Sequence, residues 1–202
     1  MRFLANPEYF RKEHQSIKPP ENNKKKQSLR EVYEWIDAVI AAIIVLVLLF
    51  TFVFRIAGVD GESMMDTLND NDRVVLFKAF YTPKQGDIVV ITQPNFMHKP
   101  LIKRIIATEG QTVGINFETG AVFVDGVELY EPYIKELTKH CEDVEFPLEI
   151  LPGYVFVMGD NRMKSMDSRD SRIGLIETHY ILGKAILRVY PFTGIKFFSN
   201  PF

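Results

Sequence analysis

The chain has 202 residues, 47% of them hydrophobic, and a formal net charge of −2. That length accommodates one globular domain and one membrane-spanning segment, and it excludes a second large domain. A near-neutral chain lacks the basic face that phosphate neutralisation requires, so nucleic acid is not expected as a partner. The single cysteine, Cys141, excludes an intrachain disulfide and a thiolate metal cage, and the four histidines lack the spacing of a zinc-binding helix. We therefore expect neither a catalytic metal nor a cofactor.

An uncharged apolar run extends from Ala38 to Phe54, and apolar neighbours extend the predicted membrane anchor to residues 35–57. A bilayer core of about 30 Å is crossed by roughly 20 such residues in a helix. A buried helix of a soluble protein would normally keep one polar stripe, which this run lacks. The long polar segment before it argues against a cleaved signal peptide, so the anchor is expected to remain in the mature protein.

The charges that flank the anchor predict its direction. Its N-terminal side carries Arg2, Arg11, Lys12, Lys18, Lys24, Lys25, Lys26 and Arg30, whereas Arg55 and then Asp60, Glu62, Asp66, Asp70 and Asp72 follow it. By the positive-inside rule, residues 1–34 form a basic cytoplasmic tail and residues 58–202 lie outside the cytoplasm. The stretch from Lys18 to Gln27 has the composition of a flexible linker, and the tail is expected to be poorly ordered. The predicted location is the cell membrane, crossed once, with the lipid bilayer as a partner.

Beyond the anchor, short runs rich in Val, Ile and Phe are separated by turn residues, a pattern typical of β-strands. The runs are Arg73–Phe77, Asp87–Thr92, Leu101–Ala107, Ala121–Leu129, Gly153–Gly159 and Lys184–Phe192. Asp125-Gly126 predicts a tight hairpin, and Pro83–Asp87 and Leu151–Gly153 predict turns. The mixed-charge stretch Tyr130–Leu151 predicts a variable excursion within a small insert at about residues 110–152. The fold class is therefore mainly β.

Three segments combine residue types that support chemistry, although each is ambiguous alone. The first, Gly61–Leu68, places Ser63 shortly after the anchor, followed by Met64 and Met65, which could face lipid or an apolar substrate. A lone serine is more often solvated or capping. The third, Gly159–Arg169, is a polar loop directly after an apolar strand, and it would suit either the support of a site or an ordinary surface loop.

The second segment holds Lys103 inside the apolar run Leu101–Ala107. Side chains alternate along a strand, so Lys103 and Arg104 point to opposite faces. If Lys103 faces the core, desolvation lowers the pKa of its amine, which then suits a general base near neutral pH. The alternative is an exposed lysine that blunts a sheet edge.

Taken together and in this order, the segments resemble the type I signal peptidases, membrane-bound serine proteases that remove signal peptides from exported proteins. The matching residues are Ser63, Met64, Thr67 and Leu68, then Lys103 and Arg104, the whole loop Gly159–Arg169, and Gly86–Val89. The resemblance implies a signal-peptidase-type β catalytic domain with one N-terminal transmembrane helix. The short insert suggests the compact single-anchor bacterial form.

The mechanism implied by the resemblance is a Ser-Lys dyad, with Ser63 as nucleophile and Lys103 as base. The backbone N–H of Ser63 would supply one oxyanion donor. Ser165 would hydrogen-bond the lysine amine, and the supporting residues would be Asp160, Arg162, Asp167 and Arg169. Substrates would be exported preproteins, bound as an extended strand against a sheet edge with small residues at positions −1 and −3. Met64 and Met65 are candidates for contacts with substrate.

Two positions depart from the family pattern. Asp66 replaces the proline of the nucleophile segment, and its charge would raise the pKa of Lys103 if the two groups approached. Gly61 stands where some relatives have a hydroxyl that donates to the oxyanion. Two alternatives therefore stay open: a specialised relative that serves a narrow set of substrates such as pilin subunits, and a non-catalytic membrane-anchored assembly or chaperone factor.

Overall fold

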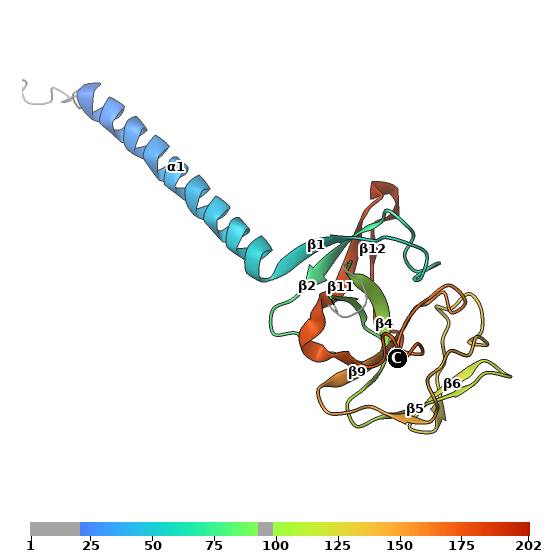
Figure 1. Ribbon diagram of the computed structural model, residues 1–202. Coiled ribbons are helices and arrows are strands. Elements are labelled where there is room, and N and C mark those ends of the chain that lie inside the picture. Colours follow the sequence, from blue (N-terminus) through green and yellow to red (C-terminus); the bar gives the residue numbers. More distant parts are fainter. Residues whose placement is uncertain (1–20, 93–98) are drawn as a thin grey trace, which may run out of the picture. The chain divides into compact units, whose positions relative to one another are not determined.

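The computed structural model describes residues 21–92 and 99–202, and the chain divides into two compact units after Val47 (Figure 1). Helix α1 (Glu21–Phe52) contains a 26-residue stretch, Gln27–Phe52, that is long and apolar enough to cross a membrane. Its large apolar side chains, such as Ile43 and Leu46, are about half exposed on an isolated helix. A helix with apolar residues on all sides needs a lipid or protein surface to cover it.

The helix begins earlier and ends earlier than the sequence suggests. It starts at Glu21, so the predicted flexible linker Lys18–Gln27 is wrong from that residue on, whereas residues 1–20 lie outside the described part. Glu, Lys and Gln are good helix formers, and an existing helix is easily extended through them. At the other end α1 stops at Phe52, and residues 54–57, which we assigned to the anchor, belong to a strand.

That strand, β1 (Phe54–Gly58), pairs antiparallel with β2 (Arg73–Phe77), from Phe54 opposite Phe77 to Gly58 opposite Arg73. An apolar run that passes from a helix into a strand has no change of composition at the boundary, which is why hydropathy placed the end of the anchor too late.

The main sheet has eight strands in the order β1-β2-β11-β3-β4-β9-β10, with β12 also paired to β11. The remaining bounds are β3 (Ile88–Ile91), β4 (Leu101–Thr108), β9 (Tyr154–Met158), β10 (Ile176–Glu177), β11 (Ile181–Tyr190) and β12 (Lys196–Phe197). Each run predicted as a strand contains one, so the mainly β prediction is confirmed. Short 3-10 helices η2 (Thr178–Tyr180) and η3 (Phe192–Gly194) flank β11.

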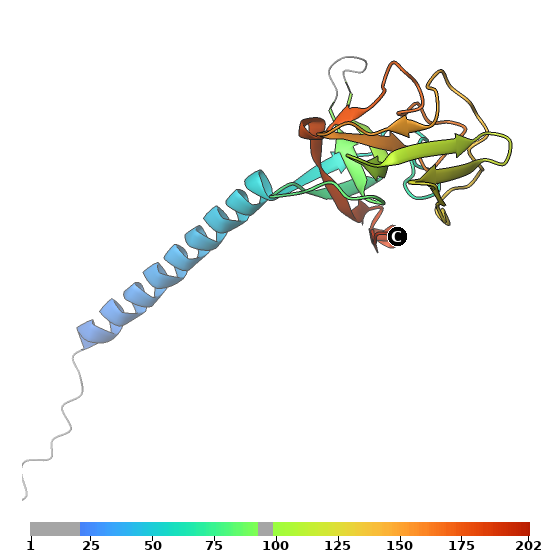
Figure 2. The same ribbon diagram turned by 90° about the horizontal axis from the view of Figure 1, so that it is seen from below.

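A second sheet of four strands lies within the predicted insert, in the order β7-β6-β5-β8. Its strands are β5 (Thr112–Asn116), β6 (Ala121–Val124), β7 (Val127–Glu128) and β8 (Leu148–Glu149). Asp125 and Gly126 both have positive φ, +53° and +78°, as a two-residue hairpin of the predicted kind requires. Figures 1 and 2 show β5 and β6 at the side of the β domain away from β1.

The hydrophobic core fixes the segments that carry the candidate site. Met64 and Leu68, on either side of Thr67, are 1% and 0% exposed and pack with Leu76 and Ile102 in one cluster. Ile105 belongs to a different cluster, with Val89 and Val157. Strand β4 therefore has buried residues on both faces, and it is an interior strand of the sheet.

Gly183 of β11 lies so close to β2 that no side chain fits. A Cβ atom there would lie 2.7 Å from the carbonyl oxygen of Phe77. We expect Gly183→Ala to lower the free energy of unfolding by about 1–3 kcal/mol, because the β2–β11 pairing must shift. Urea unfolding of the full chain in detergent micelles, followed by circular dichroism, measures this change. Gly114→Ala in β5 is the matched control, since its Cβ would meet Phe123 at an ordinary 3.8 Å. Equal midpoints for the two variants would contradict the prediction.

Candidate active site

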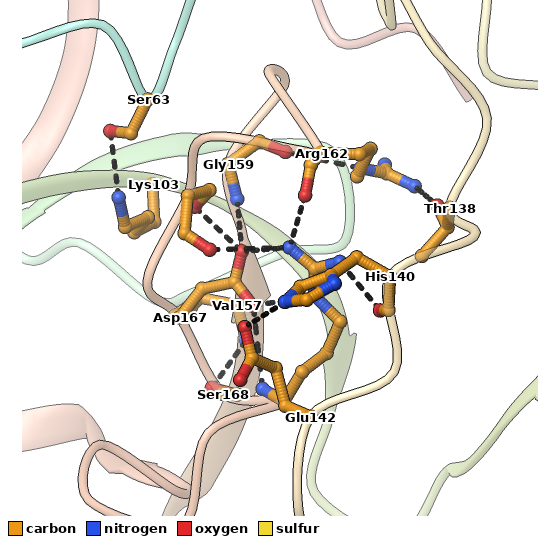
Figure 3. Close-up of polar contacts among 12 residues, drawn as sticks. Ser63, Lys103, Thr138, His140, Glu142, Val157, Gly159, Arg162, Asp167 and Ser168 are labelled. Carbon is orange, nitrogen blue, oxygen red and sulfur yellow. Dashed lines mark hydrogen bonds and ion pairs between the residues drawn. The ribbon is translucent and has the colours of Figure 1, made fainter.

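Ser63 and Lys103, 40 residues apart in sequence, meet in the structure. The amine Nζ of Lys103 lies 2.7 Å from Oγ of Ser63, at hydrogen-bond distance (Figure 3). Ser63 lies in the loop between β1 and β2 and is half-buried, whereas Lys103 is the third residue of β4 and only 3% exposed. The alternative of an exposed edge lysine is therefore wrong.

The surroundings of Lys103 favour its neutral form. Burial lowers the pKa of the Lys103 amine to about 8, opposed by the charges of Asp167 and Asp160 and assisted by that of Arg169. An amine with this pKa is substantially neutral at mildly alkaline pH and can accept the proton of a hydroxyl. The arrangement is thus chemically suited to activating Ser63 as a nucleophile.

The backbone at Ser63 is held by the loop that begins at Gly159. The backbone N–H of Asn161 donates to the carbonyl of Ser63 at 3.0 Å, and the Asn161 side chain donates to the carbonyl of Glu62 at 3.0 Å. Gly159 packs against the carbonyl of Ser63: a Cβ atom on Gly159 would lie 2.4 Å from that oxygen and 2.2 Å from Oγ of Ser165. Only glycine permits this approach of the two segments.

Asp167 is the centre of the hydrogen bonds beneath the pair. Its carboxylate accepts from the backbone N–H of Gly159 at 2.9 Å, from Oγ of Ser165 at 2.6 Å and from the guanidinium of Arg169 at 2.8 Å (Figure 3). Burial opposes ionisation of Asp167, but Arg169 and the hydrogen bonds outweigh it and hold the pKa of this carboxyl below its ordinary value. The predicted bond from Ser165 to the lysine amine is not among the hydrogen bonds of the described residues; Ser165 donates to Asp167 instead.

Arg104, next to Lys103 on β4, points to the opposite face and is equally buried. Its guanidinium donates two hydrogen bonds to Asp160, at 2.8 and 2.6 Å, and a third to the carbonyl of Gly86 at 2.9 Å. Asp160 also accepts a hydrogen bond from Oγ1 of Thr67. The buried Arg104–Asp160 pair therefore holds Thr67, which lies four positions after Ser63.

Arg162 and Arg169 are buried with partners of their own. Arg162 donates to the carbonyl of Gly159 at 3.0 Å and forms two bonds with Glu131, whereas Arg169 donates to the carbonyl of Arg162 at 2.9 Å. Because both guanidinium groups are paired, their burial does not leave an unpaired charge in the interior. The structure thus joins Arg162, Ser165, Asp167 and Arg169 in one hydrogen-bond network, whereas Asp160 pairs with Arg104.

Other predictions for the nucleophile segment change. Met64 is 1% exposed and part of the core, so the expectation that it faces lipid or substrate is wrong, whereas Met65 is half-buried. Asp66 is exposed and lines a cavity beside Arg104. The charges acting on the pKa of Lys103 are those of Asp167, Arg169 and Asp160. Gly61 has a φ of +98°, and its N–H donates to Asp70 at 2.9 Å.

A groove of about 490 Å³ lies over β1, β2 and β3. Its lining includes Ala57 of β1, Leu76 of β2 and Val90 of β3, together with Asp60 and Pro100, each three residues before a member of the pair in the sequence. Strand β4 pairs with β9 only from Arg104 onward, so among the described residues the first part of β4 has a partner on one side alone. No three His, Cys, Asp or Glu residues in the described part are grouped as metal ligands.

Sequence reasoning gave no role to several residues of the site. Thr67 and Asn161 lie inside the recognised segments. Thr67 is a polar residue close to Ser63 in the sequence and Asn161 directly follows Asp160, and these positions were the available signal for a role in the site. Glu131 and Tyr133 lie in the excursion between β7 and β8, where nothing local to the sequence indicates a contact with the site.

Comparison with known proteins identifies the relatives of the chain. Residues 32–190 match the family described as signal peptidase, peptidase S26. Signal peptidase I of Bacillus licheniformis is 36% identical over 182 residues, which cover 85% of this chain and 94% of that protein. Signal peptidase I T of Bacillus subtilis is 32% identical, covering 85% of this chain and 92% of that protein. A signal peptidase I structure from Enterococcus faecalis is 27% identical, with a TM-score of 0.44, and covers 52% of this chain and 98% of the other. The chain belongs to the signal peptidase family, peptidase S26.

Proposed function

We propose that this protein is a membrane-bound serine endopeptidase that removes N-terminal signal peptides from exported preproteins with a Ser63–Lys103 dyad. The observation that carries the proposal is the 2.7 Å contact between the two side chains, made by a buried lysine whose pKa is lowered to about 8. The relatives that share most of the chain are named signal peptidase I, which supports the substrate class.

In the proposed reaction, the neutral amine of Lys103 accepts the proton of Ser63 while Oγ attacks the scissile carbonyl carbon. The carbon–nitrogen bond then breaks, the Lys103 ammonium gives that proton to the leaving amine, and an ester to Ser63 remains. A water molecule deprotonated by Lys103 attacks the ester, and the proton returns to Oγ as the signal peptide leaves.

The oxyanion needs hydrogen-bond donors that are already in place. In the described residues no group accepts a hydrogen bond from the backbone N–H of Ser63, so this donor is available for the role. Gly61 offers no hydroxyl, and its own N–H is engaged by Asp70. We infer that the hole relies mainly on backbone at Ser63.

The substrate would lie in the groove as an extended segment. Strand β1 is at the edge of the sheet, and the first part of β4 lacks a second partner among the described residues, so both present backbone groups to an added strand. Ala57, Leu76 and Val90 give the groove an apolar lining, which suits small apolar side chains before the cleaved bond. Met65 remains a candidate contact.

The proposed location follows from α1 and its flanking charges. The helix would cross the cell membrane once, with basic residues such as Arg30 on the cytoplasmic side and the β domain outside. The domain would then meet preproteins where they leave the membrane.

The dyad is tested by Ser63→Ala and Lys103→Met in the full chain in liposomes. We expect each to reduce preprotein cleavage by about 10³-fold or more, because one removes the nucleophile and the other the base. Gel analysis of a panel of preproteins measures the loss. The matched controls are the exposed Ser171→Ala and Lys139→Met, which should retain activity. Wild-type turnover by either dyad variant would exclude the mechanism; an inert wild type would favour a non-catalytic role, and cleavage of only one class of preprotein a specialised enzyme.

The pH dependence follows from the lowered pKa of Lys103. The base must be neutral, so kcat/KM should rise from pH 6 and level off above an apparent pKa of about 8. Initial rates with a fluorogenic peptide containing a signal-peptide cleavage site would give the profile. An acid limb near pH 4 instead would point to a carboxylate as the base.

A further inference from the structure

Two residues of the excursion between β7 and β8 reach the arginines beside the dyad. Glu131 contacts Arg162 through both carboxylate oxygens, and the two side chains are 5% and 0% exposed. The hydroxyl of Tyr133 donates to the same carboxylate at 2.9 Å. The excursion therefore supplies a buried counter-charge to a loop that lies 31 residues further along the chain.

The ring of Tyr133 covers the other arginine. The guanidinium carbon of Arg104 lies 3.9 Å from the centre of this ring, which is within the range of a cation–π contact. All three donor nitrogens of Arg104 are engaged by Asp160 and Gly86, so its flat face is the surface left for Tyr133. Through Asp160 and Thr67 this contact reaches the segment of the nucleophile.

Tyr133 also contacts the segment that contains Asn200 and Phe202. The ring of Phe202 meets that of Tyr133 edge to face, with 6.1 Å between centres. Asn200 donates to the carbonyl of Gln85 at 2.7 Å, and a Cβ atom on Gly86 would lie 2.3 Å from the Asn200 side chain. Tyr133 thus contacts both Arg104 and Phe202.

We propose that Glu131 and Tyr133 are positioning residues for the dyad, which they serve by holding Arg162 and Arg104. The turnover measurement below rests on the function proposed above. The inference deepens that function, because it assigns part of the active site to the excursion. Glu131 fixes the loop beneath Ser63 through Arg162 and the carbonyl of Gly159. Tyr133 fixes Arg104 against Asp160.

The contact also affects the charge near Lys103. The groups that act on the Lys103 amine are Asp167, Asp160 and Arg169, and the negative charge of Asp160 favours its protonated form. Arg104 neutralises Asp160 only while the two remain paired. If the ring over Arg104 is lost, water enters and the pairing loosens, and both changes make the protonated amine more favourable.

The test compares Tyr133→Leu, Tyr133→Phe and Tyr130→Leu in the full chain in detergent micelles. Tyr130 is 79% exposed, so the same substitution three residues away is the matched control. We expect Tyr133→Leu to lower kcat about tenfold at pH 8 with KM changed less than about twofold. Tyr133→Phe keeps the ring and should stay close to wild type, as should Tyr130→Leu.

The second readout needs no substrate. NMR titration of ¹³C-lysine-labelled protein, with the Lys103 signal assigned from Lys103→Met, should show a higher Lys103 pKa in Tyr133→Leu. A purely structural role would lower the melting temperature but leave that pKa unchanged, which overturns the proposal. If Tyr133→Leu does not fold, Phe202→Ala replaces it in the titration. A smaller rise in the Lys103 pKa would support the proposal, and an unchanged Lys103 pKa would overturn it. An inert wild type would overturn the proposed function alone, because the titration still reports on positioning.

Discussion

The contact between the amine of Lys103 and the hydroxyl of Ser63 is the interaction on which the rest of the site depends. Burial favours the neutral form of this amine, yet six other charged side chains are buried close by, in the pairs Arg104–Asp160, Arg162–Glu131 and Arg169–Asp167. A single unpaired carboxylate about 4 Å from the amine would contribute roughly 4 kcal/mol at an effective dielectric of 20, or about three pKa units. That is enough to return the lysine to its protonated form. Pairing these carboxylates with arginines therefore helps to keep the pKa of the Lys103 amine low, besides satisfying the buried charges themselves.

Backbone packing sets the distance between the two side chains as much as hydrogen bonds do. Ser63 is placed by buried neighbours, Met64 and Leu68, and by a carbonyl that contacts Gly159. Lys103 is placed by β4, which pairs with β3 from Leu101 to Arg104 and with β9 from Arg104 onward. A flexible loop would lose conformational entropy each time Ser63 met the amine. In this structure the packing of the loop already holds Ser63 in place.

Most strands, and the meeting of Ser63 with Lys103, were predictable because both depend on local pattern and recognisable segments. Short runs rich in Val and Ile predicted β2, β3, β4, β9 and β11 of the main sheet, and Asp125-Gly126 predicted the β6–β7 hairpin of the second sheet through the need for positive φ. The end of α1 was not predictable in the same way, since Phe54 and Ile56 are equally apolar in a helix and in a strand. Met64 was misjudged for a similar reason: next to a membrane, an apolar residue suits lipid, substrate or core equally well, and only the tertiary packing distinguishes them.

The partners of the buried arginines show a different limit of prediction from sequence. Arg162 is part of a segment that the sequence identifies, but its counter-charge Glu131 comes from a stretch of mixed charge where one carboxylate looks like another. Removing one partner of a buried pair leaves the other uncompensated at a cost of about 3–5 kcal/mol. The loop Gly159–Arg169 is therefore not self-sufficient, and a chain with a rearranged excursion would keep a working loop only if another acidic group reached the same guanidinium. In this fold the segment that looks most variable by composition supplies a charge that the most recognisable segment requires.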